Sequence, residues 1–154
     1  MSAAAYQTVV VGTDGSESSY RAVATAGALA GACDAVLVVV CAYLPDDPNS
    51  RDVKDAERAL GDEAYQVVGS HPAEEKVRAA AERAQQAGAK KVRTLAVVGS
   101  PVPTLLDVIG KEKADLLVVG NRGLASIKGR LLGSVPADAT RRAECDVLIV
   151  HTTH

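Results

Sequence analysis

The chain has 154 residues, of which 47% are hydrophobic and 23% charged, and its formal net charge is −2. This composition excludes a disordered chain, and the near-zero charge argues against a non-specific nucleic-acid binder. The absence of Phe and Trp argues against a surface that stacks single-stranded bases, and it predicts an aliphatic core.

The first part of the chain predicts a strand–helix–strand unit. The β-branched run Tyr6–Gly12 is typical of a buried strand. The Ala-rich segment Ser18–Gly31 predicts a helix that ends at its glycine, and Ala35–Ala42 predicts the second strand. A loop rich in Pro and Asp follows, and the charged segment Asp52–Tyr65 predicts a short helix.

The same alternation continues through the middle of the chain. Pro72–Ala87 predicts a helix with proline near its first turn, and Val92–Val98 predicts the third strand. The next helix begins at its cap, Ser100, and runs to about Ile109, where Gly110 is expected to end it.

The last third completes a predicted parallel sheet. Asp115–Val119 is the fourth strand, Pro136–Arg142 a short helix and Asp146–His151 the fifth strand. Repeated strand–helix units favour a Rossmann-like α/β fold, an open five-stranded parallel sheet with helices on both faces. We expect one domain over residues 1–154.

Glycines follow three of the predicted strands. They lie in Gly12–Ser16, Gly99–Ser100 and Gly120–Gly123. Ligands bind open parallel sheets beyond the carboxyl ends of the strands, where glycine lets backbone approach a ligand closely. Each glycine could instead mark an ordinary turn, but three at one edge favour a binding cleft.

The sharpest pattern is the spacing Gly-x2-Gly-x9-Gly-Ser that begins at Gly120 and ends at Ser134. Backbone N–H groups at a helix start, beside a serine hydroxyl, suit a phosphate. Three basic residues lie in this loop, namely Arg122, Lys128 and Arg130. The P-loop and dinucleotide glycine motifs are both absent, which disfavours P-loop NTPases and dinucleotide dehydrogenases.

These residues resemble the nucleotide-binding branch of the universal stress protein family over nearly the whole chain. The resemblance is carried by Val9–Ser16, Ala114–Gly120, the glycine spacing, Ser134–Pro136 and Cys145–Val150. In detail, Gly129–Pro136 and Val147–Thr152 resemble small actinobacterial members that bind cyclic AMP. The resemblance implies a fold like that of the adenine nucleotide alpha hydrolases.

The resemblance also implies the roles of individual residues. Asp14 would bind the ribose hydroxyls or a phosphate-bound Mg²⁺, and Ala42 would meet the adenine through its backbone. The other expected site residues line the pocket, flank the ribose or hold the phosphates: Gly12, Thr13, Val119, Gly120, Arg122, Gly123, Gly133, Ser134 and Val135. For both Asp14 and Ser134, the alternative role is a helix N-cap.

The expected ligand is ATP, with Mg²⁺, or cyclic AMP. The basic loop favours a triphosphate, whereas the finer resemblance favours cyclic AMP, and the sequence leaves this choice open. We expect a regulatory binding module in the stress response. The alternatives are a slow ATPase or phosphotransfer enzyme, or a dimeric interaction protein that needs no nucleotide.

The resemblance implies a homodimer through the strand Asp146–His151, whose apolar edge would invite pairing. Three widely spaced cysteines indicate free thiols in the cytoplasm. No signal peptide is recognisable, and the longest apolar run, Ala35–Leu44, is far shorter than the ~20 residues of a membrane span. We therefore expect neither a membrane nor a nucleic-acid partner.

Overall fold

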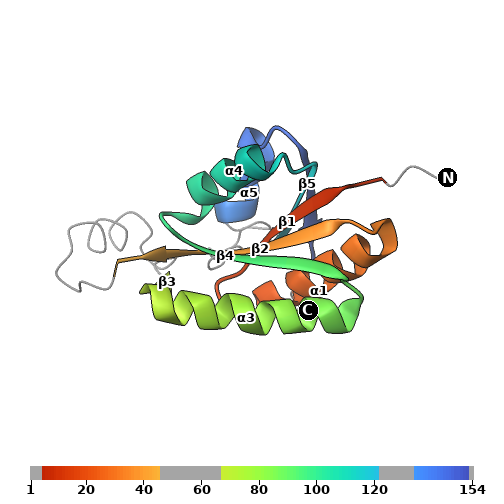
Figure 1. Ribbon diagram of the computed structural model, residues 1–154. Helices are drawn as coiled ribbons and strands as arrows, with labels where there is room; N and C mark the ends of the chain where they lie inside the picture. The colour runs from red at the N-terminus through yellow and green to blue at the C-terminus, as the bar shows by residue number, and fades with distance from the viewer. Residues whose placement is uncertain (1–4, 46–66, 122–133, 153–154) are drawn as a thin grey trace.

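A twisted parallel sheet runs through the molecule, with helices on both of its faces (Figure 1). The structure is a computed structural model, and it describes residues 5–45, 67–121 and 134–152. Its strands are β1 (Thr8–Gly12), β2 (Val36–Leu44), β3 (Val67–Val68), β4 (Lys91–Val98), β5 (Leu116–Gly120) and β6 (Asp146–Val150). Its helices are α1 (Glu17–Cys33), α3 (Ser70–Ala87), α4 (Pro101–Glu112) and α5 (Ser134–Arg142).

Five of these strands lie in the order β4–β2–β1–β5–β6, and every pair is parallel. The two-residue strand β3 pairs with the end of β2, at Tyr43 and Leu44, beyond the point where β1 stops. Within the described residues, the sheet therefore has one short strand more than the five expected. The expected parallel α/β fold is confirmed.

The core lies in two layers because successive side chains of each strand point to opposite faces. Val9 and Val11 of β1 pack beneath α1 and α3, whereas Val10 packs with Val102 and Leu105 of α4. All three valines of β1 are completely buried. Such continuous burial is typical of a parallel sheet covered on both faces.

Close contact between α1 and α3 depends on two glycines. A Cβ atom on Gly27 would lie 2.6 Å from the Ala84 carbonyl oxygen, and one on Gly31 would overlap the carbonyl oxygen of Gly88. The expectation that Gly31 ends its helix is wrong, because α1 continues to Cys33. Its C-cap is Asp34, which adopts the left-handed conformation with φ 54°.

The expected end of the fourth helix at Gly110 is also wrong. α4 continues through this glycine to Glu112, and its C-cap is Lys113, with φ 53°. In both helices a non-glycine residue adopts the left-handed cap conformation that glycine adopts more commonly.

The remaining predicted elements agree with the structure to within about two residues at their ends. The final strand stops at Val150 instead of His151, and β3 had no clear signal in the sequence. The predicted helix Asp52–Tyr65 lies outside the described residues. In the described part of the chain, no helix is long and apolar enough to cross a membrane.

Two glycine-to-alanine substitutions should change stability in opposite directions. Gly27→Ala should lower the free energy of unfolding by about 1–3 kcal/mol, because its methyl group meets the backbone of α3. Gly110→Ala should raise it by about 0.5–1 kcal/mol, because an added Cβ has no neighbour within 4 Å. Urea unfolding measures both, and equal changes in the two variants would contradict this account of the helix contact.

Candidate functional site

The chain order of the strands leaves an opening beside the carboxyl end of β1. β1 lies between β2 and β5. It continues into α1, on one face of the sheet, whereas β5 is followed along the chain by α5, which packs with α4 on the other face. Connections that leave adjacent strands toward opposite faces create the crevice in which open α/β sheets bind ligands.

A tightly bonded turn, Thr13–Ser16, joins β1 to α1 at this opening. The Thr13 backbone N–H donates to the Val40 carbonyl oxygen at 2.9 Å, and the Gly15 N–H donates to Thr13 Oγ1 at 3.1 Å. Gly15 has a φ of 85°, a conformation that favours glycine. The sequence Gly-Thr-Asp-Gly-Ser therefore holds the turn through its own side chains and backbone.

Asp14 does not cap α1. The cap is Ser16, whose hydroxyl oxygen accepts a hydrogen bond from the Ser19 backbone N–H at 3.1 Å. Asp14 Oδ1 accepts from the Ser16 N–H at 2.9 Å, while Oδ2 has no hydrogen-bond partner among the described residues. Asp14 is only 8% exposed, so a largely buried carboxylate with one free oxygen among the described residues lies beside the crevice.

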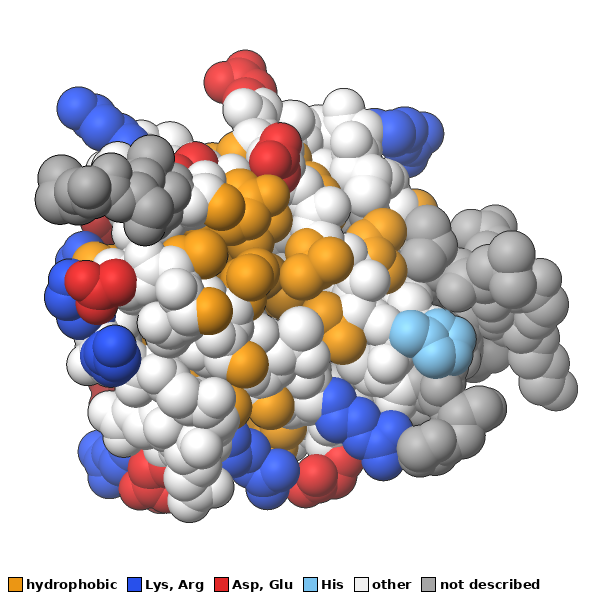
Figure 2. Space-filling model, turned by 90° about the vertical axis from the view of Figure 1, so that its right-hand side faces the viewer, with side chains coloured by type: hydrophobic (Ala, Val, Ile, Leu, Met, Phe, Trp, Pro, Cys, Tyr) orange, Lys and Arg blue, Asp and Glu red, His pale blue; other side chains and the backbone are white. Residues whose placement is uncertain are grey.

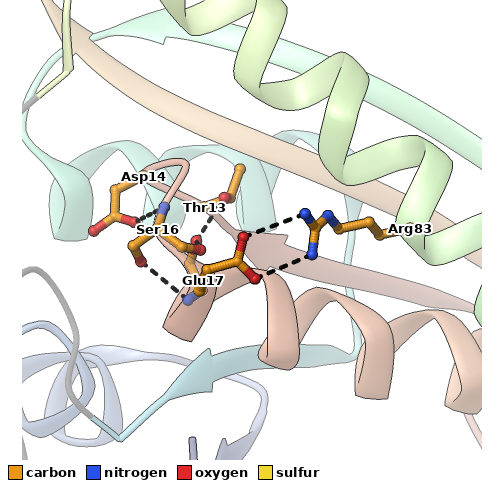
Figure 3. A network of polar contacts seen from close by, with 6 residues as sticks. Thr13, Asp14, Ser16, Glu17 and Arg83 are labelled. Atoms are coloured by element: carbon orange, nitrogen blue, oxygen red, sulfur yellow. Dashed lines mark hydrogen bonds and ion pairs between the residues drawn. The ribbon is translucent and has the colours of Figure 1, made fainter.

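Figure 3 shows Asp14 on the side of the turn away from the ion pair between Glu17 and Arg83. That pair joins the start of α1 to α3 at 3.3 Å, and the Arg83 guanidinium also lies 4.2 Å above the centre of the Tyr20 ring. Because Arg83 already has these partners, it braces the two helices and leaves Asp14 unpaired.

β2 forms one side of the crevice because it extends past β1. Gly12, the last residue of β1, pairs with Val40, and β2 continues through Ala42 to Leu44. Ala42 is half-buried, and no residue of β1 pairs with it, because β1 ends opposite Val40. Tyr43 packs against the core on the α1 and α3 face, whereas the strand alternation turns Ala42 to the opposite face.

The end of β5 is tied to the C-terminal segment by a buried polar network. Asn121 Oδ1 accepts hydrogen bonds from the Thr152 backbone N–H at 2.8 Å and from Thr152 Oγ1 at 3.0 Å. The Thr152 hydroxyl lies 2.5 Å from the Ser18 hydroxyl of α1, and Arg21 donates to the Thr152 carbonyl oxygen at 2.7 Å. This network fixes the residue that follows Gly120, where the glycine-rich segment begins.

The structure brings together the predicted site residues that it describes. These are Gly12, Thr13 and Asp14 after β1, Ala42 on β2, and Val119 and Gly120 at the end of β5. The backbone of Ser134 and Val135 forms the start of α5. Arg122, Gly123 and Gly133 lie outside the described residues. Where the structure describes the chain, no group of three or more His, Cys, Asp or Glu residues could hold a metal.

Sequence reasoning missed three residues at this edge, namely Asn121, Thr152 and Lys76. Asn121 and Thr152 are buried polar residues whose pairing joins distant parts of the chain, and nothing in the local sequence announces such a contact. Lys76 had a readable signal, because it interrupts an apolar helical stripe.

Known proteins align with most of this chain. The model of the Universal stress protein family matches residues 5–151. Universal stress protein Rv1636 of Mycobacterium tuberculosis is 56% identical to this chain, over 97% of this chain and 99% of the length of Rv1636. A relative from Thermus aquaticus is 33% identical over 94% of this chain and 98% of its own.

Solved structures agree in fold. A crystal structure of a universal stress protein in complex with cAMP has a TM-score of 0.74, with 47% identity over 96% of this chain and 98% of its own. A universal stress protein from Archaeoglobus fulgidus in complex with dAMP has a TM-score of 0.64 over 94% of this chain and 97% of its own. At 22% identity, this second structure supports the fold alone.

The thiol of Cys41, next to Ala42, should be inert in the folded protein. Burial, together with a smaller effect of the nearby Asp14 carboxylate, raises its pKa to about 12. Alkylation requires the thiolate, so iodoacetamide at about pH 8 should leave Cys41 unmodified until urea unfolds the chain. Mass spectrometry of the peptides measures this, and labelling of Cys41 in the native protein would contradict the burial argument.

Proposed function

Because the chain belongs to the universal stress protein family, we propose that it binds an adenine nucleotide, with cyclic AMP as the first candidate. Binding would make it a nucleotide-responsive regulatory module in the stress response. We propose that it acts in the cytoplasm. ATP with Mg²⁺ is the second ligand to test.

The observation that carries this proposal is the Asp14 carboxylate at the crevice. One of its oxygens is held by the Ser16 N–H, and the other has no partner among the described residues. A fixed carboxylate is a strong acceptor for ribose hydroxyl groups. The 47% identity to a protein crystallised with cAMP supports cyclic AMP as the ligand that this acceptor meets.

The remaining contacts follow from the backbone around the crevice. Gly120 is half-buried at the end of β5, and its backbone would flank the ribose. The backbone of Ala42 on β2 would offer hydrogen bonds to an adenine edge. The N–H groups at the start of α5 suit a phosphate, as helix N-termini do. Gly123, Gly133, Ser134 and Arg122 belong to this proposed phosphate site through their sequence positions.

Replacing Asp14 should weaken nucleotide binding without unfolding the protein. We expect Asp14→Ala to lower the affinity for cyclic AMP at least tenfold, since a charge-assisted hydrogen bond is lost. Asp107→Ala is the matched control, because this exposed aspartate lies on α4 and, among the described residues, forms an ion pair only with Lys111. Titration calorimetry with cyclic AMP, ATP, AMP and GTP, with and without Mg²⁺, gives the affinities.

Failure of the wild-type protein to bind any adenine nucleotide would overturn the proposal. Phosphate release from ATP above background, lost in Asp14→Asn, would instead indicate an ATPase.

We also propose that the chain forms a homodimer through β6. This strand lies at one edge of the sheet, and Leu148 on it is 36% exposed. Val147 and Ile149 are half-buried. Figure 2 shows that hydrophobic side chains reach the surface together on one side of the molecule, with charged groups around them. An exposed apolar edge strand favours pairing with a second copy across a two-fold axis.

A charge on β6 should dissociate such a dimer. Leu148→Glu should shift the sedimentation coefficient at micromolar concentration from dimer to monomer, because pairing would bury the carboxylate. Val98→Glu is the control, since Val98 is 57% exposed on the opposite edge strand, β4. A wild-type monomer, or equal dissociation in the two variants, would count against an interface at β6.

A further inference from the structure

Lys76 stands out on α3 because it interrupts the buried stripe of this helix. Ala73, Val77 and Ala80 are buried on the face that packs on the sheet and on α1. Residues three and four apart share one helix face, so Lys76 belongs to the same stripe. It is half-buried. A lysine in such a position loses part of its hydration, which is costly without compensation.

The Lys76 side chain lies directly over the turn that carries Asp14. A Cβ atom on Gly15 would be 2.7 Å from Lys76 Cδ and 2.8 Å from Lys76 Nζ. The side chain therefore covers the backbone one residue beyond Asp14. The two charges also act on a common neighbour, because the Asp14 carboxylate raises the pKa of the Cys41 thiol and the Lys76 ammonium lowers it.

Lys76 has no carboxylate within 4.0 Å among the described residues. Arg83, the other basic residue on the side of α3 that faces α1, pairs with Glu17 and stacks on Tyr20. The positive charge of Lys76 thus lies over the turn beside the crevice, while the charge of Arg83, about two helical turns farther along α3, is neutralised. Such an arrangement suits an anionic ligand at the turn.

We propose that Lys76 is a specificity-determining residue of the nucleotide site, one that binds an anionic group adjoining the ribose and so favours a 3′,5′-cyclic phosphate. This inference rests on the proposed function, in which Asp14 binds the ribose. A cyclic phosphate joins the 5′ oxygen, on the side of the proposed phosphate site at α5, to the 3′ oxygen of the ribose. Its 3′ side would therefore lie next to the ribose edge that Asp14 binds, within reach of a cation beside Asp14.

The position of α5 gives a reason why Lys76 would favour cyclic AMP over ATP. Lys76 reaches the turn from α3, which covers the same face of the sheet as α1. The start of α5, the proposed phosphate site, belongs to the helix layer of the opposite face. The β- and γ-phosphates of ATP would extend toward α5 and away from Lys76. Lys76 therefore contributes more to the binding of cyclic AMP than of ATP.

The test compares ligands that differ in the charge next to the ribose. We expect Lys76→Met to lower the affinity for cyclic AMP about tenfold, since it removes one charge-assisted contact. Its affinity for adenosine should stay within about twofold and that for ATP within about threefold, because neither depends on this contact. Titration calorimetry on the full chain gives all three values for each variant.

Matched variants separate charge from shape. Lys90→Met removes the same charge at the opposite edge of the sheet, beside the start of β4, and should leave all three affinities unchanged. Lys76→Arg should retain most of the preference for cyclic AMP. Lys76→Gln provides a second neutral side chain should the methionine variant unfold, with circular dichroism as the check on folding.

The outcomes distinguish this inference from the proposed function. Wild-type binding of cyclic AMP that Lys76→Met and Lys76→Gln leave unchanged overturns the role of Lys76 alone. Equal losses for adenosine and cyclic AMP also overturn it, because they indicate a change of shape. A larger loss for ATP than for cyclic AMP reverses the assigned specificity. If the wild-type protein binds no adenine nucleotide, both proposals fail together.

Discussion

Burial of β1 on both faces is the constraint on which the rest of the structure depends. Its three central valines are completely buried, so helices must cover each face closely, and the chain has no Phe or Trp to fill a wider gap. The helices therefore approach on small residues, as Gly27 and Gly31 of α1 do against α3. The same two-sided cover places α1 and α5 on opposite faces and opens the crevice between β1 and β5.

The sequence predicted the fold well because its signals are periodic and local. Runs such as Val9–Val11 and Leu116–Val119 are buried on both faces, and short, β-branched apolar runs of this kind are typical of strands in a parallel sheet. The ends of α1 and α4 were less predictable. Gly31 carries the local signature of a helix end, but its role is a close tertiary contact, and no local pattern separates these two uses of glycine.

The candidate site was predicted in part, for a related reason. The turn that carries Asp14 is predictable from the short segment Gly12–Ser16. Only the hydrogen bonds of the structure show that Ser16, and not Asp14, caps α1. Lys76 lies 62 positions farther along the chain, and only the packing of α3 against α1 brings it to Gly15. The partners of Asn121 depend on the path of the final strand, which a linear motif does not record.

The network around Thr152 also provides a position for a fluorescent probe of the crevice. This residue bonds to Asn121 at the end of β5 and lies against Ser18 of α1, while its neighbour His151 is exposed. A fluorophore attached at position 151 would sit outside the core yet beside segments from both sides of the crevice. Its emission would therefore respond to small movements of these segments, and the folded chain could serve as its own optical sensor.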